Sequence, residues 1–551
     1  MELLKKLFKS VMILIGIFAM FIVVIIAIMM LGKVSIFGFS FINETDKIDI
    51  NIATVGPDKM IDNDGTINTI KIKTNRAIAG VEYYDDETST GITIRLQYTL
   101  QGIAKGEVKT VSFAKSEPAE VFNSYTKVID VMSIEPEGVF FANNCTLTVY
   151  LPYNMGLNDI EIETGKAKGV HINENCLKKV DDLKTVKQLN LDHLKINQTG
   201  ANFSGLNIGK IEYWEKPNTM IKVEKPNLIV NSLEVSTIAG RVNINCPIND
   251  NVMLRSEFGT FVFKKLKSRI NDTVYANSVG GNVIIEGNIP AVEFGTISNE
   301  IVKKAKNGED FEVNDQFNIN GQLLINANAT VQVSGYINGA VGLNKNGASL
   351  RANILKDYLT ATSGCGGINI VGYVDGEIAI GTDTNVDVTV NDIFINNCKS
   401  SVIIKANNKP VLINKLSGSN CDIETNRGMI TVKSIDNAST VNLTAKDGSI
   451  HANFTGNTIT GENNIKATGS GNVNVTFKIG QKFKLFAKAK NQSKIKIDLN
   501  TFVTFGEEAN EPSIDEGGFT YYDEQINDNT NNAISVNLSV IKGTINGKYA
   551  E

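Results

Sequence analysis

The most regular pattern of apolar and polar residues lies between residues 421 and 498. Three short polar turns in this stretch contain Gly428, Gly448 and Gly471, and each is followed by a run in which apolar and polar residues alternate. A fourth, weaker copy at 487–497 has Ser493 in place of the glycine. Alternation places apolar side chains on one face of a strand, and turn glycines about 20 to 23 residues apart are typical of a solenoid. The pattern therefore predicts a β-solenoid.

The same alternation recurs over most of the chain. A strand at 146–152 ends at Pro152, and the runs at 235–244, 254–263 and 274–285 carry glycines about 20 residues apart. One coil cannot bury its inward side chains, whereas stacked coils share one interior. We expect an all-β chain with a solenoid at 146–505, in which glycine allows the turns to adopt positive φ. Residues 33–145 are expected to form a membrane-proximal β-domain or the cap of the solenoid. Residues 506–551 are expected to form an acidic loop and closing strands that shield the open end.

A charged segment at 299–315 interrupts the alternation. Lysines and acids follow one another closely there, at Lys303, Lys304, Lys306, Glu309 and Asp310. Such a solvated stretch between alternating runs predicts an insertion or a boundary between subdomains.

The amino terminus carries an uncharged apolar run at 11–31, which spans about 30 Å as a helix and is long enough to cross a bilayer. Lys5, Lys6 and Lys9 precede it and predict that residues 1–10 are cytoplasmic, with the bulk of the chain extracellular, although Lys33 weakly opposes this. A cleaved signal peptide is the alternative. The run is longer than the usual ~7–15 residues and no small-x-small cleavage site follows. We therefore expect residues 11–32 to be an uncleaved single-pass anchor in the cell membrane.

Three stretches carry a resemblance to a known family: the Leu-x-Val-x-Leu-Pro run at 147–152, the residues 162–165 that end on Gly165, and the turn and strand at 468–475. With them the chain resembles a large family of bacterial surface domains called putative adhesins. The resemblance implies a glycine-turn β-solenoid at the bacterial cell surface, whose ligand is open.

Composition agrees with a β-protein, because 47 glycines accompany only 10 prolines. A net charge of -5 gives no general case for nucleic-acid binding. The six cysteines lie far apart, with no Cys-x-x-Cys pair. We interpret them as small buried residues, while a disulfide between Cys398 and Cys421 on adjacent coils stays open.

No motif for catalysis, metal or cofactor binding stands out. The three histidines lie in separate segments without a metal-ligand spacing, and we expect no cofactor. Asp383 and Asp387 share one parity in an alternating run, so they are weak candidates for carboxylates of a polysaccharide-active enzyme. No histidine or basic partner completes that site, and a solvated outer face is the simpler interpretation.

Two surface features are better candidates for ligand contact. Six lysines share even-numbered positions in alternating runs and predict a basic face: Lys482, Lys484, Lys488, Lys490, Lys494 and Lys496. Such a face would attract an anionic wall polymer or a phospholipid surface, although lysines also discourage pairing at strand edges. Tyr213 and Trp214 include the only tryptophan and are weaker candidates for sugar stacking or partner contact.

These observations predict a membrane-anchored, adhesin-like β-solenoid that acts without catalysis, as a binding or envelope-organising module. Its expected partners are the membrane and an anionic cell-wall polymer, a glycan or a surface protein, but no nucleic acid. A scaffold subunit of a membrane complex and an anchored polysaccharide-active enzyme are the alternatives. A cleft with convergent carboxylates would indicate the enzyme. A contiguous apolar patch or an unshielded strand edge would indicate the scaffold.

Overall fold

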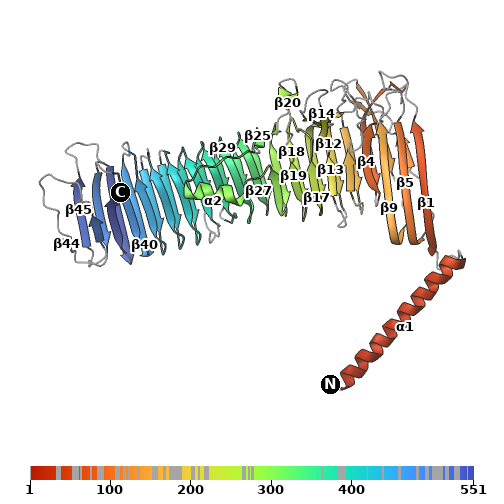
Figure 1. Cartoon of the computed structure of the whole chain (residues 1–551), viewed down its shortest axis with the longest axis horizontal. Helices are drawn as coiled ribbons and strands as arrows, with labels where there is room; N and C mark the ends of the chain where they lie inside the picture. The colour runs from red at the N-terminus through yellow and green to blue at the C-terminus, as the bar shows by residue number, and fades with distance from the viewer. Residues whose placement is uncertain are drawn as a thin grey trace. The chain divides into compact units, whose positions relative to one another are not determined.

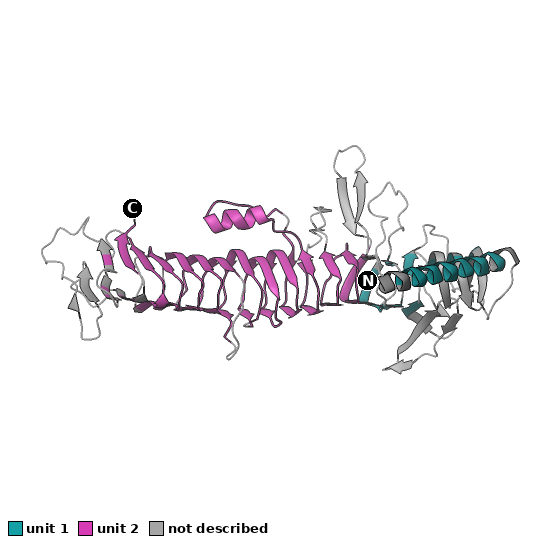
Figure 2. Cartoon of the chain, turned by 90° about the horizontal axis from the view of Figure 1, so that it is seen from below, with its two compact units in different colours: residues 1–212 teal, residues 213–551 magenta. Residues whose placement is uncertain are grey.

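The computed structural model describes the following residues: 2–32, 39–52, 61–62, 65–74, 77–83, 92–105, 112–115, 119–121, 124–132, 137–151, 159–165, 169–172, 189–199, 205–208, 211–215, 222–226, 228–263, 269–270, 273–274, 278–314, 316–362, 364–382, 392–418, 420–436, 440–456, 461–478, 483–489, 495–498, 513–514, 520–526, 534–542 and 544–550. The chain divides into two compact units, residues 1–212 and residues 213–551 (Figure 2).

The first unit begins with the helix α1 (Glu2–Gly32). Its segment Phe8–Ile28 has a mean hydropathy of 3.4, and none of it is buried inside the protein. Among the described residues this is the one helix long and apolar enough to cross a membrane. The helix starts nine residues earlier than the predicted span at 11–32, because the lysine-bearing residues before the apolar run are helical as well.

The strands of the first unit are β1 (Phe39–Ile52), β2 (Ile61–Asp62), β3 (Gly65–Thr74), β4 (Ile78–Tyr83), β5 (Ile92–Lys105), β6 (Ser112–Lys115), β7 (Ala119–Val121), β8 (Ser124–Met132), β9 (Glu137–Leu151), β10 (Asp159–Thr164), β11 (Gly169–Ile172), β12 (Leu189–Gln198) and β13 (Gly205–Ile208). β1, β5 and β9 pair antiparallel. β3 and β4 pair in parallel with β10 and β11. Parallel coils are thus present within 65–83, in the segment for which a membrane-proximal domain or cap was expected.

The strands of the second unit follow β14 (Ile211–Glu215), which straddles the division between the units. They are β15 (Lys222–Pro226), β16 (Leu228–Thr237), β17 (Arg241–Ile244), β18 (Val252–Ser256), β19 (Thr260–Phe263), β20 (Arg269–Ile270), β21 (Thr273–Val274), β22 (Ser278–Val279), β23 (Val283–Gly287), β24 (Ala291–Phe294), β25 (Asn318–Ile319), β26 (Leu323–Ala327), β27 (Thr330–Ile337), β28 (Val341–Leu343), β29 (Ser349–Leu355), β30 (Leu359–Ala361), β31 (Ile368–Val374), β32 (Ile378–Ile380), β33 (Ile393–Cys398), β34 (Val402–Ala406), β35 (Val411–Leu416), β36 (Asn420–Thr425), β37 (Ile430–Ile435), β38 (Thr440–Ala445), β39 (Ile450–Phe454), β40 (Glu462–Ser470), β41 (Val473–Phe477), β42 (Phe483–Ala489), β43 (Ile495–Asp498), β44 (Ser513–Ile514), β45 (Thr520–Ile526), β46 (Ile534–Lys542) and β47 (Ile545–Tyr549).

Within this unit the strands stack in parallel as two sheets (Figures 1 and 2). One sheet runs from β16 and β18 through β23, β26 and β28 to β40, and the other from β17 and β19 through β24, β27 and β29 to β41. Several strands of the second sheet, such as β27 and β29, shift register part-way, so their second halves form a further line of parallel pairing. The prediction of an all-β solenoid behind an apolar N-terminal helix is confirmed.

The core consists of columns in which each inward side chain lies beside the corresponding one of the next coil. One column runs through strands β27 to β41 and contains the buried residues Val331, Leu350, Ile368, Ile393, Val411, Ile430, Ile450 and Val473. Aromatic residues stack in the same way, and the rings of Phe263 and Phe294 are 4.3 Å apart. Each coil buries its apolar face only against its neighbours, which is why the alternating pattern has to persist from coil to coil.

The turn glycines of the predicted repeat are needed for a different reason from the one expected. Gly428, Gly448 and Gly471 do not have positive φ. A Cβ on each would instead collide with a backbone carbonyl oxygen of the preceding coil: that of Lys409 for Gly428, of Gly428 for Gly448, and of Gly448 for Gly471. Glycine is required at these turns because successive coils approach too closely for any side chain.

Asparagines on the outer faces form hydrogen-bonded ladders from coil to coil. Asn344 donates to Asn326 at 2.9 Å, and Asn414 donates to Asn396 at 2.8 Å, in each case across 18 residues of sequence. Such ladders give asparagine a structural role on the outer faces, because an amide in register with another amide can donate to its oxygen.

Five of the cysteines, Cys145, Cys246, Cys365, Cys398 and Cys421, are buried and free, while Cys176 lies outside the described residues. Cys398 and Cys421 are therefore not bridged. Burial raises the pKa of the Cys246, Cys398 and Cys421 thiols, which keeps them protonated and unreactive.

Candidate functional site

The strongest candidate for a binding surface is an outward row of residues on the first sheet of the second unit, which we call the uncharged row. Strand pairing places seven residues side by side on successive coils: Met253, Ile284, Leu324, Gly342, Thr360, Ala379 and Ile403. Each lies between two inward, buried neighbours, as Thr360 does between Leu359 and Ala361. All seven therefore face outward, and none is charged.

Charged residues mark both ends of the uncharged row. Glu234 pairs with Met253 at one end, and Asp422 pairs with Ile403 at the other. Six steps of about 4.8 Å between neighbouring strands give the row a length of about 29 Å. Gly342 is buried, with the side chains of Leu324 and Asn344 close to it, whereas Ile403 is 42% exposed.

Amide and aromatic groups flank the uncharged row. Asn326 and Asn344 lie two residues further along their strands than Leu324 and Gly342, and their side chains are hydrogen-bonded to each other. Tyr358 lies two residues before Thr360, is uncharged, and is 45% exposed. Arg255 and Glu286, two residues beyond Met253 and Ile284, form an ion pair at 2.6 Å on the same face. The surface thus combines apolar contacts, amide groups, one exposed aromatic ring and a paired charge at one end.

Lys356 and Lys399 are each engaged by another side chain. Lys356 donates a hydrogen bond to the Tyr373 hydroxyl at 3.1 Å, and Lys399 forms an ion pair with Asp375 at 2.8 Å. The ammonium group of Lys399 also lies 3.4 Å from the centre of the Tyr373 ring. The hydrogen bond with Tyr373 raises the pKa of Lys356 above its ordinary value, so this lysine stays charged.

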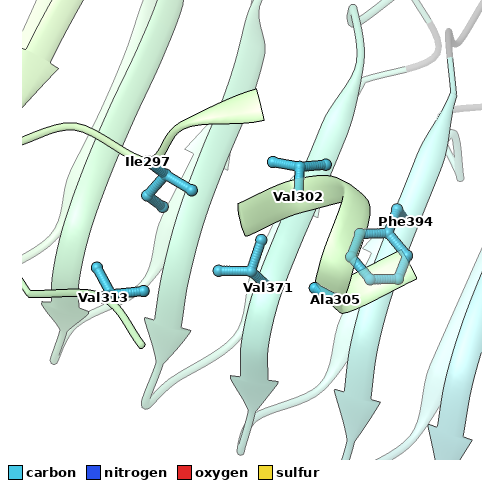
Figure 3. Close-up of a cluster of buried hydrophobic side chains, with 6 residues drawn as sticks. All are labelled: Ile297, Val302, Ala305, Val313, Val371 and Phe394. Carbon is cyan, nitrogen blue, oxygen red and sulfur yellow. The ribbon is translucent and has the colours of Figure 1, made fainter. Parts of the chain in front are cut away.

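A second group of outward apolar residues, on the other sheet, is covered. Phe394 lies between the inward residues Ile393 and Ile395 and so faces outward, yet it is only 1% exposed. The helix α2 (Asn299–Asn307) packs over it, and Val302 and Ala305 of the helix form one buried cluster with Val371 and Phe394 (Figure 3). Figure 2 shows α2 outside the stacked coils.

Polar contacts fix α2 at both ends. The Ser298 side chain accepts a hydrogen bond from the backbone N–H of Ile301, and Gly308 ends the helix in the left-handed conformation. Asn414 donates to the carbonyl oxygen of Ala305 at 2.6 Å, and Lys433 donates to that of Lys306. These donors satisfy carbonyls at the end of the helix that have no partner within it.

The contrast between the two faces singles out the uncharged row. The insertion predicted at 299–315 is present, and its helix seals the apolar residues of one sheet. Within the part of the chain that the structure describes, no helix or strand packs over the row on the other sheet. An apolar surface that is left open while a neighbouring one is covered indicates a site of interaction.

The structure does not join the described lysines of the predicted basic face. Lys484 and Lys488 belong to β42, which pairs with β46 and β45, whereas the exposed Lys496 belongs to β43, which pairs with β47 of the other sheet. Lysines on β42 and β43 therefore belong to different faces of the solenoid. Lys482, Lys490 and Lys494 lie outside the described residues.

The weaker candidates can be placed only in part. Tyr213 and Trp214 are in β14, which forms a two-stranded sheet with β15, and their side chains lie outside what the structure describes. Asp383 and Asp387 also lie outside the described residues, in the connection between β32 and β33. A search of the described residues finds no group of three or more His, Cys, Asp or Glu side chains that could hold a metal ion.

Comparison with known proteins adds little. No protein-family model matches the sequence, and no curated protein matches it. A crystal structure described as a "putative cell adhesion protein" from Clostridium sporogenes ATCC 15579 aligns over 92% of this chain and 100% of its own length. The identity is 8% and the TM-score is 0.14, and at that score the likeness supports no argument about this chain.

Proposed function

We propose that this chain is a membrane-anchored, non-enzymatic binding protein of the cell surface, with an adhesin-like role. The apolar segment Phe8–Ile28 would hold it in the membrane. The observation that carries the proposal is the uncharged row, in which seven neighbouring strands each place an uncharged residue at the same outward position and which no described helix or strand covers. A rigid stack of strands holds such a surface in shape, so little ordering is lost on binding.

A glycan chain is the partner that the uncharged row and its flanks favour. Sugar rings present apolar C–H faces together with hydroxyl groups. Leu324 and Ile403 offer apolar contact, Tyr358 offers an exposed ring, and the amides beside the row offer hydrogen bonds. The length of about 29 Å suits an extended chain that lies along the solenoid.

Docking of another protein is the second candidate function, as in a scaffold of a membrane complex. Its support is the size of the apolar side chains at the ends of the row, Met253, Ile284 and Ile403. Exposed apolar side chains in one contiguous line are typical of protein interfaces.

Binding measurements with the full-length chain in nanodiscs test both functions. The ligands are a glycan array, whole cells, and membrane proteins captured by cross-linking. Thr360→Glu combined with Ala379→Glu places two charges at the centre of the row and is expected to weaken binding at least tenfold, because the partner would have to desolvate them.

Thr444→Glu is the matched control, because Thr444 faces outward from β38 on the same sheet beyond the row. It is expected to leave binding unchanged. If the double variant no longer binds a glycan that the unaltered chain binds, the first function is supported. If it no longer captures a protein that the unaltered chain captures, the second is supported. Equal binding by the double variant and the control would contradict both.

A further inference from the structure

The last coil of the solenoid is inserted between two earlier coils. β46 pairs in parallel with β40 on one side and with β42 on the other. β47 lies in the same way between β41 and β43. The C-terminal coil, which we define as β46 and β47, therefore fills a slot between the coil β40–β41 and the coil β42–β43.

Side chains of the C-terminal coil match the coil below it. Asn464 donates to Asn442 of the preceding coil at 3.0 Å. Asn537 continues this ladder and donates to Asn464 at 3.0 Å across 73 residues of sequence. Asn546 donates to Asn474 at 2.6 Å across 72 residues. Inside the coil, Val536, Leu538, Val540, Ile545 and Tyr549 are buried.

The coil that follows directly in sequence could not make these bonds. Phe486 of β42 pairs with Asn537, and Lys496 of β43 pairs with Asn546. If β42 and β43 stacked directly on β40 and β41 in the same register, Phe486 would lie beside Asn464, and Lys496 beside Asn474. Both ladders would then lose their amide partners, which costs free energy wherever the amide is shielded from water. The slot is thus specific for the C-terminal coil.

Synthesis order leaves the slot empty for a time. A chain made from its amino terminus completes β40 to β43 before β46 and β47 exist, so the edges of β40 and β41 wait for a segment more than 70 residues further on. Open parallel edges accept any strand with the matching pattern. The hydrogen bonds that β46 makes are the same whichever copy of the chain supplies it.

We propose that the C-terminal coil is a separable segment, and that the slot between β40–β41 and β42–β43 also accepts this coil from a second copy of the chain. The interaction surface is the pair of parallel edges on β40 and β41, and its partner is a strand pair with asparagines at the positions of Asn537 and Asn546. Completion in trans joins two copies without any new contact.

The test uses the full chain with a protease site introduced at 527–533, between β45 and β46, cleaved after folding. The fragment that carries the coil is expected to stay bound in native buffer. A labelled peptide of residues 533–551, added in excess, is expected to replace it. A peptide with Asn537→Leu and Asn546→Leu is expected to bind on the order of tenfold more weakly, since it lacks both amide bonds.

A peptide with Ser539→Ala is the control, because Ser539 shares the outward face of β46 with Asn537 but pairs with Lys466 and not with an asparagine of either ladder, and it is expected to bind like the unaltered peptide. Two results would overturn the proposal. In one, the fragment leaves on cleavage and no peptide rebinds. In the other, no exchange occurs until the whole chain unfolds, in which case the coil is not separable.

Discussion

The turn glycines Gly428, Gly448 and Gly471 form a column in which each contacts the backbone of the coil before it. Their role could be predicted from the sequence only as a need for glycine. The physical reason, close approach instead of positive φ, depends on the distance between coils, which no local pattern specifies. Elsewhere positive φ does apply, as at Gly240 and Gly347.

Gly448→Ala is expected to destabilise the coils around β37–β39 by roughly 1–3 kcal/mol, because the new methyl group cannot avoid the Gly428 carbonyl without a backbone shift. Hydrogen exchange of the backbone amides in these strands measures the loss. Gly308→Ala is the comparison, since that glycine has open space and only its φ of 81° to strain. A smaller loss of hydrogen-exchange protection in Gly448→Ala than in Gly308→Ala would contradict the explanation by close approach.

Asp447 links two turns and makes their stability depend on pH. It accepts hydrogen bonds from the backbone N–H and the hydroxyl of Ser470, at 3.0 and 3.1 Å. These bonds hold the pKa of Asp447 below its ordinary value of 3.8. Its contribution to stability is therefore complete above about pH 4 and is lost as pH falls through the lowered pKa.

Asp447→Ala is expected to lower the thermal unfolding midpoint at about pH 7, and the difference from the unaltered chain should shrink at about pH 3. Asp422→Ala serves as a control, because Asp422 is an exposed carboxylate of a neighbouring strand. A difference for Asp447→Ala that stays constant between the two pH values would show that the carboxylate charge is not the cause.

At the scale of single elements, α2 accounts for the difference between the two outward apolar surfaces, because it covers the one that contains Val371 and Phe394. The sequence predicted an insertion at this place but not a helix. The signals were nevertheless present: Ser298 as N-cap, Ile301, Val302 and Ala305 at helical spacing, and Gly308 at the end. They were outweighed by the charged residues, which occupy the solvent face of the helix.

Phe394→Ala is expected to loosen α2, because the buried ring belongs to the cluster under the helix, and truncating a buried phenylalanine costs about 3–5 kcal/mol. Faster hydrogen exchange in residues 299–307 is the measurement. Phe258→Ala is the control, since Phe258 is 64% exposed at a turn and should leave this exchange unchanged. Unaltered protection of α2 in Phe394→Ala would mean that its end contacts alone hold the helix.

The uncharged row could not be found from the sequence, although alternation was expected over most of the chain. Its members become neighbours only through strand pairing across unequal intervals. Leu324 and Gly342 are 18 residues apart, whereas the step between the coils of β23 and β26 takes 40 because α2 is inserted. A fixed period of about 20 residues therefore aligns the wrong residues on either side of each insertion.

At the scale of the whole molecule, the alternating pattern and the regular spacing of the turn glycines predicted the fold class, because stacked coils bury the apolar face of each short strand against its neighbours. The alternating pattern did not predict the order in which the coils stack. The C-terminal coil is placed by amides more than 70 residues away, at Asn464 and Asn474. The predicted lysine face depended on β42 and β43 sharing a surface, whereas β42 and β43, like β40 and β41 before them, belong to different sheets.

We propose that the chain is an anchored solenoid that binds a partner through the uncharged row. Site-specific photo-cross-linking from the full-length chain in the membrane tests this most directly. A photoreactive side chain at Leu324 or Ile403, both in the uncharged row, is expected to capture a glycan or protein partner, and one at Thr444 on the same sheet is expected to capture none. Equal capture from all three positions, or capture from Thr444 alone, would contradict the central claim.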